Sequence, residues 1–156
     1  MNYWLMKSEP STFSIQMLKE KKNRQESWDG VRNYQARNFM RDEMKRGDLA
    51  LFYHSSCKEI GVVGIVEIVK ESHPDKTALD ENSAYFDPKA TKDNPIWFMV
   101  DVAFREEFPQ IISLAEIKKH EELSEMPLLQ RGQRLSIQKV TKREFSFIKK
   151  LASLKQ

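Results

Sequence analysis

The sequence predicts a mixed α/β (α+β) fold, a small β-barrel with short helices inserted between its strands. Five stretches are rich in apolar and β-branched residues, as strands are, and they cover residues 2–7, 48–55, 59–71, 96–108 and 134–140. Only "SCK" separates the second stretch from the third. Since parallel strands need a long crossover connection, this pair should form an antiparallel hairpin. Gly61 and Gly64 in the third stretch favour a bulge or a tight bend, as barrels use to turn corners.

The helices between these strands have recognisable beginnings. The segment "SIQMLKEKK" after Phe13 is amphipathic. Ser113 and Glu116 have the spacing of a capping box, and Thr141 and Glu144 repeat this spacing before "FSFIKKLASLK". Each of the three segments is therefore expected to form a short helix.

Residues 33–46 also have helical periodicity. Lys45 and Arg46 occupy the expected last turn, and Gly47 ends the helix. Arg37 and Arg41 lie one turn apart on the exposed side. The opposite, apolar side should belong to the core and consists of Ala36, Phe39, Met40 and Met44.

Length and composition indicate one domain over residues 1–156. The chain is 40% hydrophobic and 31% charged, as soluble globular proteins are, and it can bury a core without disulfides or metals. Residues 73–94 are polar and interrupted by prolines, so they predict a long excursion rather than a linker between domains. No apolar run is long enough to span a bilayer, and we expect no membrane partner.

Charge is segregated along the chain. Residues 1–50 hold 10 basic and 7 acidic side chains, residues 51–127 hold 8 and 15, and residues 128–156 hold 8 and 1. A face built from both basic ends would attract a polyanion through phosphate contacts that release counterions. The alternative is that the C-terminal lysines only solvate a surface helix.

The sequence indicates neither a cofactor nor a metal. It contains no glycine-rich phosphate loop, so a nucleotide cofactor has no recognisable site. His54 and Cys57 make only half of a possible metal site, and as a base and nucleophile pair they are a weak candidate. Glu106 and Glu107 are adjacent and would point to opposite faces of a strand. We therefore expect that the chain is not an enzyme.

Five motifs resemble the EVE domain family, in order and over nearly the whole chain: "YWLMKSEPSTFSI", "WDGVRNYQARNFMRDEMKRGDLALFYHS", "WFMVDV", "SLAEIK" and "MPLLQRGQRLSIQKV". The resemblance implies a single EVE domain with a PUA-like barrel and a pocket for one nucleobase. Modified cytosines in DNA, such as 5-methylcytosine, are the implied ligands. The YTH readers of methylated adenine in RNA and the ASCH domains, some of which are hydrolases, belong to the same broader fold group. RNA binding and hydrolysis of a modified nucleoside are therefore the alternatives.

The stretch "WDGVRNYQARNFM" contains side chains that suit such a pocket. Flipping a base out of its stack costs a few kcal/mol, which stacking and hydrogen bonds to the base edge must offset. Trp28 and Tyr34 are suitable walls, and Asn33 and Asn38 carry donors and acceptors for a pyrimidine edge. The predicted base pocket consists of Lys7, Ser8, Trp28, Val31, Asn33, Tyr34, Asn38, Tyr53, His54 and Ser55.

Arginines provide the predicted phosphate contacts. Three of them lie at the start of the 33–46 helix or along it, and two flank Gly132 in a basic glycine turn. The predicted set consists of Arg32, Arg37, Arg41, Arg131 and Arg134.

Several of these residues have a purely structural alternative. Asn33 is also a good helix N-cap, and Trp28 is also a candidate core residue. The Ser8-Glu9-Pro10 sequence is typical of a turn after a strand. At the end of the second strand only alternate residues share a face, so Tyr53 and Ser55 would line the pocket together, or His54 would without them. Trp4 and Trp97 are expected in the core.

A cytoplasmic protein, preferably bacterial, is expected. The first residues lack the basic start and long apolar stretch of a signal peptide. The single cysteine, Cys57, cannot form an internal disulfide, which fits a reducing compartment. The eukaryotic relative has a long basic N-terminal tail, whereas this sequence begins at its first strand; a nuclear location is expected only if the source is eukaryotic.

Overall fold

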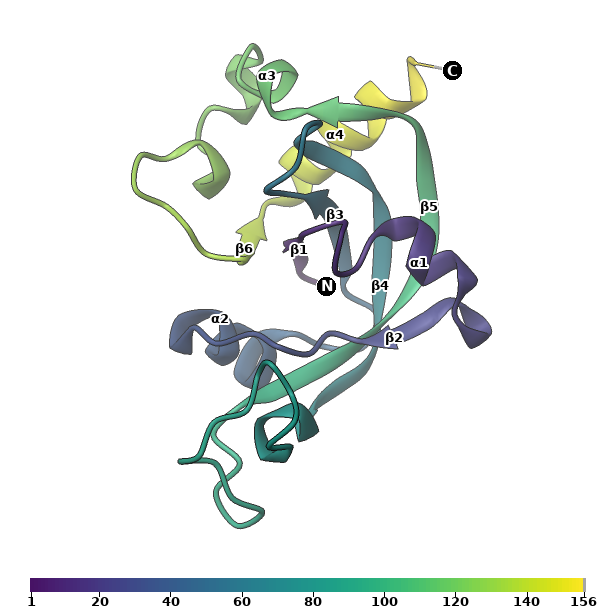
Figure 1. The fold of residues 1–156 in the computed structure, drawn as a ribbon. Helices are drawn as coiled ribbons and strands as arrows, with labels where there is room; N and C mark the ends of the chain where they lie inside the picture. The colour runs from purple at the N-terminus through teal and green to yellow at the C-terminus, as the bar shows by residue number, and fades with distance from the viewer. Residues whose placement is uncertain (156) are drawn as a thin grey trace.

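The computed structural model describes residues 1–155, which contain six strands and four α-helices (Figure 1). The strands are β1 (Tyr3–Ser8), β2 (Gln25–Ser27), β3 (Leu49–His54), β4 (Gly61–Pro74), β5 (Phe98–Ser113) and β6 (Ile137–Val140). The α-helices are α1 (Ile15–Glu20), α2 (Tyr34–Asn38), α3 (Leu114–Ile117) and α4 (Lys142–Ser153). A π-helical turn, η2 (Phe39–Glu43), continues α2, and 3-10 turns occupy Lys22–Arg24, Lys76–Leu79, Glu121–Leu123 and Pro127–Leu129.

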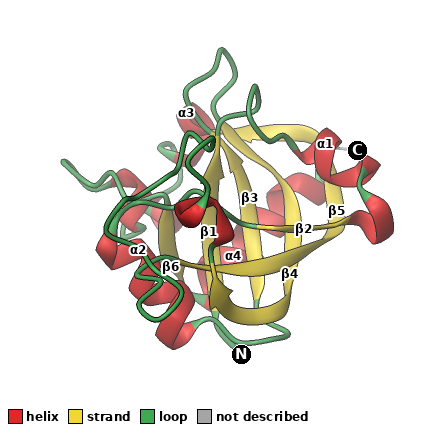
Figure 2. Ribbon diagram, turned by 60° about the horizontal axis from the view of Figure 1, so that its bottom comes forward, coloured by secondary structure: helices red, strands yellow, loops and turns green. Residues whose placement is uncertain are grey.

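The strands form one sheet in the order β2-β5-β4-β3-β1-β6. Strands β1 and β3 are parallel, and every other neighbouring pair is antiparallel. Strands β4 and β5 are long and bent (Figure 1), and the sheet as a whole curls (Figure 2). The mixed α/β class with short inserted helices is confirmed, and the expected hairpin is β3–β4.

The bend in β4 depends on its two glycines. A Cβ at Gly61 would collide with the carbonyl oxygen of Ile112, and one at Gly64 with the carbonyl oxygen of Glu106. The register between β4 and β5 shifts between Val62 and Gly64. The expected bulge is therefore present, and it lets the two backbones approach closely.

The sequence prediction was wrong at several boundaries. Strand β2 was missed because three polar residues have no apolar alternation, and β5 continues to Ser113, beyond its expected end. The helix over 33–46 ends at Met44, because the buried Asp48 carboxylate accepts the backbone N–H of Lys45 at 2.9 Å and the indole N–H of Trp4 at 3.0 Å. Lys45 and Arg46 therefore lie outside the helix.

Two hydrophobic clusters cover opposite faces of the sheet. Strand β1 shows the division, because Trp4 and Met6 belong to one cluster and Leu5 to the other. The first cluster includes Trp28, Val31, Met40 and Phe52, and the second includes Leu51, Tyr53, Phe145 and Ile148 of α4. Trp97 is buried with Ala78 and Ala90 in a third cluster in the excursion. Trp4 and Trp97 are thus core residues, as expected.

Two helix starts have the predicted caps. Ser113 accepts the backbone N–H of Glu116 at 3.1 Å before α3. Thr141 and Glu144 form a reciprocal capping box at the start of α4. Within residues 1–155 no helix has the length and apolar character needed to cross a membrane.

Candidate nucleic-acid interface

A cavity of about 770 Å³ opens between the two edges of the curled sheet. In Figure 1 the segment from β2 to α2 passes below β1, and the chain that enters β6 approaches β1 from the left. Both segments contribute to the cavity, together with the end of β1 and helix α1. Its lining consists of Lys7, Ser8, Glu9, Thr12, Phe13, Met17, Glu20, Lys21, Glu26, Ser27, Trp28, Asp29, Gly30, Val31, Arg32, Tyr85 and Ser136.

One wall is the segment 27–32, which is fixed to the sheet and to the excursion. The backbone N–H of Trp28 donates to the carbonyl of Val100 at 2.8 Å and so extends the pairing of β2 with β5. Gly30 then turns the chain with φ +79°, a conformation that favours glycine. The ring of Tyr85 lies so close to Gly30 that a Cβ there would be 2.7 Å from two ring carbons. Tyr85 thus becomes part of the wall although it lies far away in the sequence.

Arg32 uses all five of its N–H groups, and four of its five hydrogen bonds fasten this wall to the excursion. Nε and Nη2 donate to the carbonyl of Tyr85 at 3.1 and 2.8 Å, and Nη2 also donates to Thr77 Oγ1 at 3.1 Å. Nη1 donates to the carbonyl of Val31 at 3.0 Å and to Asp75 Oδ2 at 3.1 Å. These contacts leave Arg32 no N–H for a phosphate, so we do not place it among the phosphate contacts proposed below.

Asp75, 1% exposed, is the centre of the same network. Its carboxylate accepts the Gly30 N–H at 2.8 Å, the Thr77 N–H at 2.9 Å and the Thr77 hydroxyl at 2.6 Å, besides the contact with Arg32. Burial opposes ionisation, but the hydrogen bonds outweigh it, so the pKa of Asp75 is lowered. Asp75 therefore remains a carboxylate and holds the turn at Gly30.

Trp28 has both of the roles considered from the sequence. It is only 6% exposed and packs edge-on against Phe13 and Phe52, with ring centroids 5.8 and 5.4 Å apart. It also lines the cavity. The same side chain is thus a core residue and a part of the cavity wall.

The end of β1 provides Lys7 and Ser8. The Lys7 backbone N–H donates to the carbonyl of Ser136 at 2.8 Å, which extends the pairing of β1 with β6 as far as the cavity. Burial lowers the pKa of the Lys7 ammonium. The Ser8 hydroxyl donates to the carbonyl of Phe13 at 2.6 Å, and the Glu9 carbonyl accepts the N–H groups of Thr12 and Phe13. The expected turn is present, and it places both side chains at the cavity.

Asp29, which precedes Gly30 in the sequence, is a second carboxylate at this turn and lines the cavity. Its side chain remains accessible, yet the surrounding wall displaces water from it and raises its pKa. The negative charges of Asp75 and Glu26 act in the same direction. Because its pKa is raised, the ionised Asp29 carboxylate is a stronger hydrogen-bond acceptor than an ordinary aspartate.

Six residues of the predicted base pocket do not line the cavity. Asn33 caps α2 by accepting the Ala36 N–H at 3.0 Å, and Asn38 accepts two N–H groups of Arg37. Tyr34 is 57% exposed and stacks on Trp97 with centroids 4.8 Å apart. The remaining three, at the end of β3, are Tyr53, His54 and Ser55.

Tyr53, His54 and Ser55 contact other parts of the protein. Tyr53 is buried in the cluster on the far face, and this burial raises its pKa to about 12. His54 Nε2 accepts the Ile15 N–H at 3.2 Å, and burial lowers the pKa of its ring. Ser55 donates its backbone N–H to the carbonyl of Ser8.

The other predicted phosphate residues differ in their exposure and in how many hydrogen bonds they make within the protein. Arg37 is half-buried and donates to the carbonyl of Ile96 at 2.9 Å. Arg41 is exposed and forms a two-point contact with Asp42. Arg131 and Arg134 are exposed in the loop that leads to Ser136 at the cavity rim.

Sequence reasoning missed Phe13, Asp29, Tyr85 and Ser136 as cavity residues. Asp29 was within reach, since it lies in the "WDG" turn of the stretch that suggested the pocket. Tyr85 had a weaker signal, an aromatic pair "YF" in an otherwise polar excursion. Within residues 1–155 no group of three or more His, Cys, Asp or Glu side chains is arranged to hold a metal ion.

The curled sheet and its cavity define a small α/β fold with a recess of the size that ligand sites have. The chain belongs to the EVE domain family, whose model matches residues 2–151. It is 46% identical to human thymocyte nuclear protein 1 over 164 aligned positions, which cover 94% of this chain and 72% of the human protein.

Solved structures also resemble this chain in fold and in sequence. A hypothetical protein from Leishmania major matches with a TM-score of 0.94 and 47% identity, covering 100% of this chain and 97% of that one. Human THYN1 in complex with DNA containing 5-methylcytosine matches with a TM-score of 0.92 and 46% identity, covering 97% and 98%. An ASCH protein from Zymomonas mobilis, at 10% identity and a TM-score of 0.56 over 97% and 99%, shares the fold alone.

Proposed function

We propose that this chain is a non-enzymatic nucleic-acid-binding domain that takes one flipped, modified base into the cavity, with a modified cytosine in DNA as the preferred ligand. The observation that carries the proposal is the cavity itself, which combines aromatic walls with Lys7 and Asp29 in a chain 46% identical to a protein crystallised with 5-methylcytosine DNA. Its volume of about 770 Å³ lies within the range of pockets that enclose small ligands.

Aromatic side chains provide the stacking. Trp28 and Tyr85 both line the cavity, and Tyr85 is held in place by Gly30 and Arg32. Stacking on aromatic rings contributes about 1–3 kcal/mol per base, which offsets the cost of unstacking. The exposed ring of Tyr34, which stacks on Trp97, provides a stacking surface for a neighbouring nucleotide outside the cavity.

Specificity for cytosine is assigned to Asp29. Cytosine presents a donor at its exocyclic amine where thymine and uracil present an acceptor, and carboxylates accept from that amine. Val31 and Phe13 provide apolar contact for a 5-methyl group in the same lining. One carboxylate and one apolar surface are thus enough to distinguish a methylated cytosine.

Arginines around the cavity contact the phosphate backbone of the nucleic acid. Arg131 and Arg134 are exposed beside Ser136, and Arg41 and Arg37 lie along α2 and η2. These side chains position the nucleic acid without reading its sequence.

The enzyme alternative rests on the ASCH likeness, which concerns the fold alone. The human relative, 46% identical, carries the name of a nuclear protein and was crystallised with DNA, which supports a binding domain. We therefore expect nucleosides and oligomers to be recovered with unchanged mass after incubation. Hydrolysis that disappears in Lys7→Ala would overturn this part of the proposal.

The test is a binding panel at stated salt. Matched DNA and RNA oligomers differ in one position, which holds cytosine, 5-methylcytosine or thymine. Trp28→Ala should weaken binding of the preferred oligomer by about 1–3 kcal/mol and reduce its preference over the unmodified one. Because Trp28 is a core residue, Trp28→Phe and Tyr85→Ala serve as variants with less effect on folding.

Tyr34→Ala is the matched control, since it removes an exposed aromatic ring outside the cavity. It should leave the modified-base preference intact. Equal affinity of the wild type for all three oligomers would contradict base recognition. A tighter complex with RNA than with DNA would instead favour the RNA alternative.

A further inference from the structure

The outer face of α4 carries four cations and no carboxylate. The helix contains one acid, Glu144, which is 7% exposed and accepts the backbone N–H of Thr141 in the capping box. It therefore does not neutralise the outer face. The exposed residues of the helix are Lys142, Arg143, Ser146, Lys149, Lys150 and Ser153.

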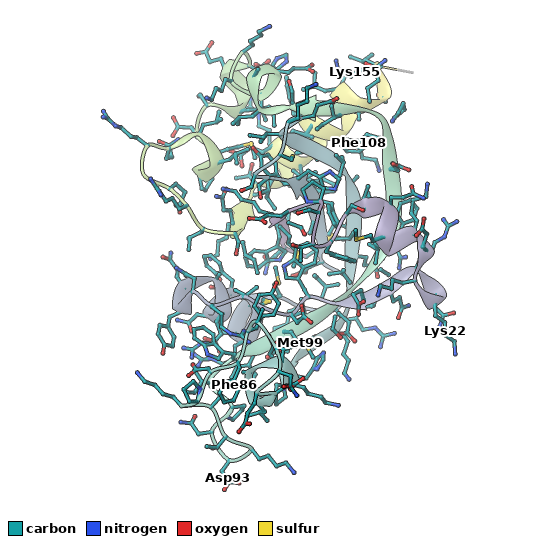
Figure 3. All side chains as sticks on the ribbon, viewed as in Figure 1. Lys22, Phe86, Asp93, Met99, Phe108 and Lys155 are labelled. Carbon is teal, nitrogen blue, oxygen red and sulfur yellow. The ribbon has the colours of Figure 1, made fainter. Side chains whose placement is uncertain are left out.

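These four cations have no ion-pair partner among residues 1–155. The basic residues that flank the helix behave differently, because Lys139 pairs with Glu43 at 2.6 Å and Lys155 with Glu116 at 3.0 Å. The excursion is remote, since its residue Asp93 lies at the opposite end of the molecule from Lys155, which follows α4 (Figure 3). The cations of the outer face are thus available to an external anion.

The same face is hollowed where α4 crosses the beginnings of β1 and β3. The hollow has a volume of about 460 Å³, and Tyr3 and Leu49 form its side toward the sheet. Lys149 and Lys150 flank it on the helix side, together with the hydroxyls of Ser146 and Ser153. Ammonium and hydroxyl donors around a shallow groove are the groups that contact phosphodiester oxygens.

This surface and the base cavity are separated by the sheet. Trp28 and Val31 of the cavity wall belong to the cluster on one face, whereas Phe145 and Ile148 of α4 belong to the cluster on the other. A base held in the cavity therefore leaves the face of α4 open.

We infer that the outer face of α4, defined by Lys142, Arg143, Lys149 and Lys150, binds the phosphodiester backbone of a second nucleic-acid segment while the cavity holds a base of the first. Charge complementarity selects a polyanion, and the choice of nucleic acid rests on the function proposed above. The contact is independent of sequence, because it involves phosphates alone. The protein then joins two segments.

The first measurement is the salt dependence of binding to an unmodified DNA duplex. Lys149→Gln/Lys150→Gln should reduce the slope of log affinity against log salt by about 1.8, since each lost phosphate contact removes about 0.9. Glutamine has nearly the same helix propensity as lysine, so α4 should stay folded. Lys118→Gln/Lys119→Gln is the control, because it removes the same charge from exposed positions after α3.

The second measurement is capture. A 5-methylcytosine duplex is immobilised, loaded with protein and washed, and a labelled unmodified duplex is then added. The wild type and the Lys118/Lys119 control should capture the label, and the Lys149/Lys150 variant should not, although it keeps its modified-base preference.

Capture by the Lys149/Lys150 variant at the wild-type level would overturn the inference, as would an equal loss in the control. Preferential binding to vesicles of phosphatidylserine and phosphatidylcholine over duplex would overturn nucleic acid as the partner. The two proposals fail separately. If the wild type shows no modified-base preference, base recognition fails, while a reduced slope confined to the Lys149/Lys150 variant still supports the surface on α4.

Discussion

Gly30→Ala tests whether Tyr85 is fixed against the cavity wall. Gly30 has φ +79°, so an alanine there costs about 1–2 kcal/mol in backbone strain. Its Cβ would also lie 2.7, 2.7 and 2.9 Å from three carbons of the Tyr85 ring. Ordinary contacts between carbons are about 3.5–4.0 Å, so the ring must move by about 1 Å. Two hydrogen bonds from Arg32 to the carbonyl of Tyr85 resist that movement.

Gly30→Ala should therefore lower the free energy of unfolding by more than the backbone strain alone. Overpacking adds about 1–3 kcal/mol, which gives about 2–5 kcal/mol in total for Gly30→Ala. Gly132 is a matched control, because it has the same φ of +79° and nothing within 4 Å of an added Cβ. Gly47, with φ +95° and equally open surroundings, is a second control.

Urea unfolding measures the free energy of unfolding of each variant. Gly30→Ala should be less stable than Gly132→Ala by about 1–3 kcal/mol, the overpacking contribution. In a Tyr85→Ala background this difference should disappear, because the contact that causes it is gone. Equal costs for Gly30→Ala and Gly132→Ala in the wild-type background would refute the contact between Tyr85 and the wall. Displacement of Tyr85 should also weaken the modified-base preference of Gly30→Ala.

Three further predictions concern charged residues. Asp29→Asn should weaken binding of the preferred oligomer at neutral pH by about 1.5–3 kcal/mol, the range for hydrogen bonds to charged groups. The affinity of the wild type should fall as the pH is lowered through the raised pKa of Asp29. If the two proteins have the same pH profile, Asp29 does not contact the base. Asp75→Asn should lower the free energy of unfolding at pH 7 by about 3–5 kcal/mol, because it breaks a buried ion pair. The folded-state pKa of Asp75 is lowered, so its stabilisation is present above the usual aspartate pKa and is lost as the pH falls toward the lower folded value; a difference in urea unfolding that persists in acid would contradict this. Arg134→Gln should weaken modified and unmodified duplexes alike and reduce the salt slope by about 0.9, and a slope equal to that of the wild type would return Arg134 to ordinary surface charge.

Elements that depend on neighbours in the sequence were predictable. The β3–β4 hairpin followed from a short connection, and the bulge at Gly64 from a glycine inside a strand. The capping box of Thr141 and Glu144 needs only residues three apart. The end of the helix at Met44 was not predictable in this way, because the buried carboxylate of Asp48 ends it.

The candidate site was predictable only in part. Lys7, Ser8, Trp28 and Val31 came from motifs and line the cavity. Tyr34 shares the same motif but stacks on Trp97, because the excursion brings that ring to the first turn of α2. A motif thus identified the segment without specifying which of its side chains face the cavity.

The sequence by itself determined the charge segregation and five of the six strands, the caps of α3 and α4 and the β3–β4 hairpin, because these elements depend on residues that are close along the chain. Only the tertiary structure decided the partners of Arg32. They are Asp75, Thr77 and Tyr85, which lie 43 to 53 positions further along the chain. It also placed α4 and the cavity on opposite faces of the sheet. The physical reason is that an arginine or a tyrosine has the same local pattern whether it meets solvent, a phosphate or another part of the chain, and the return of a distant segment selects among them.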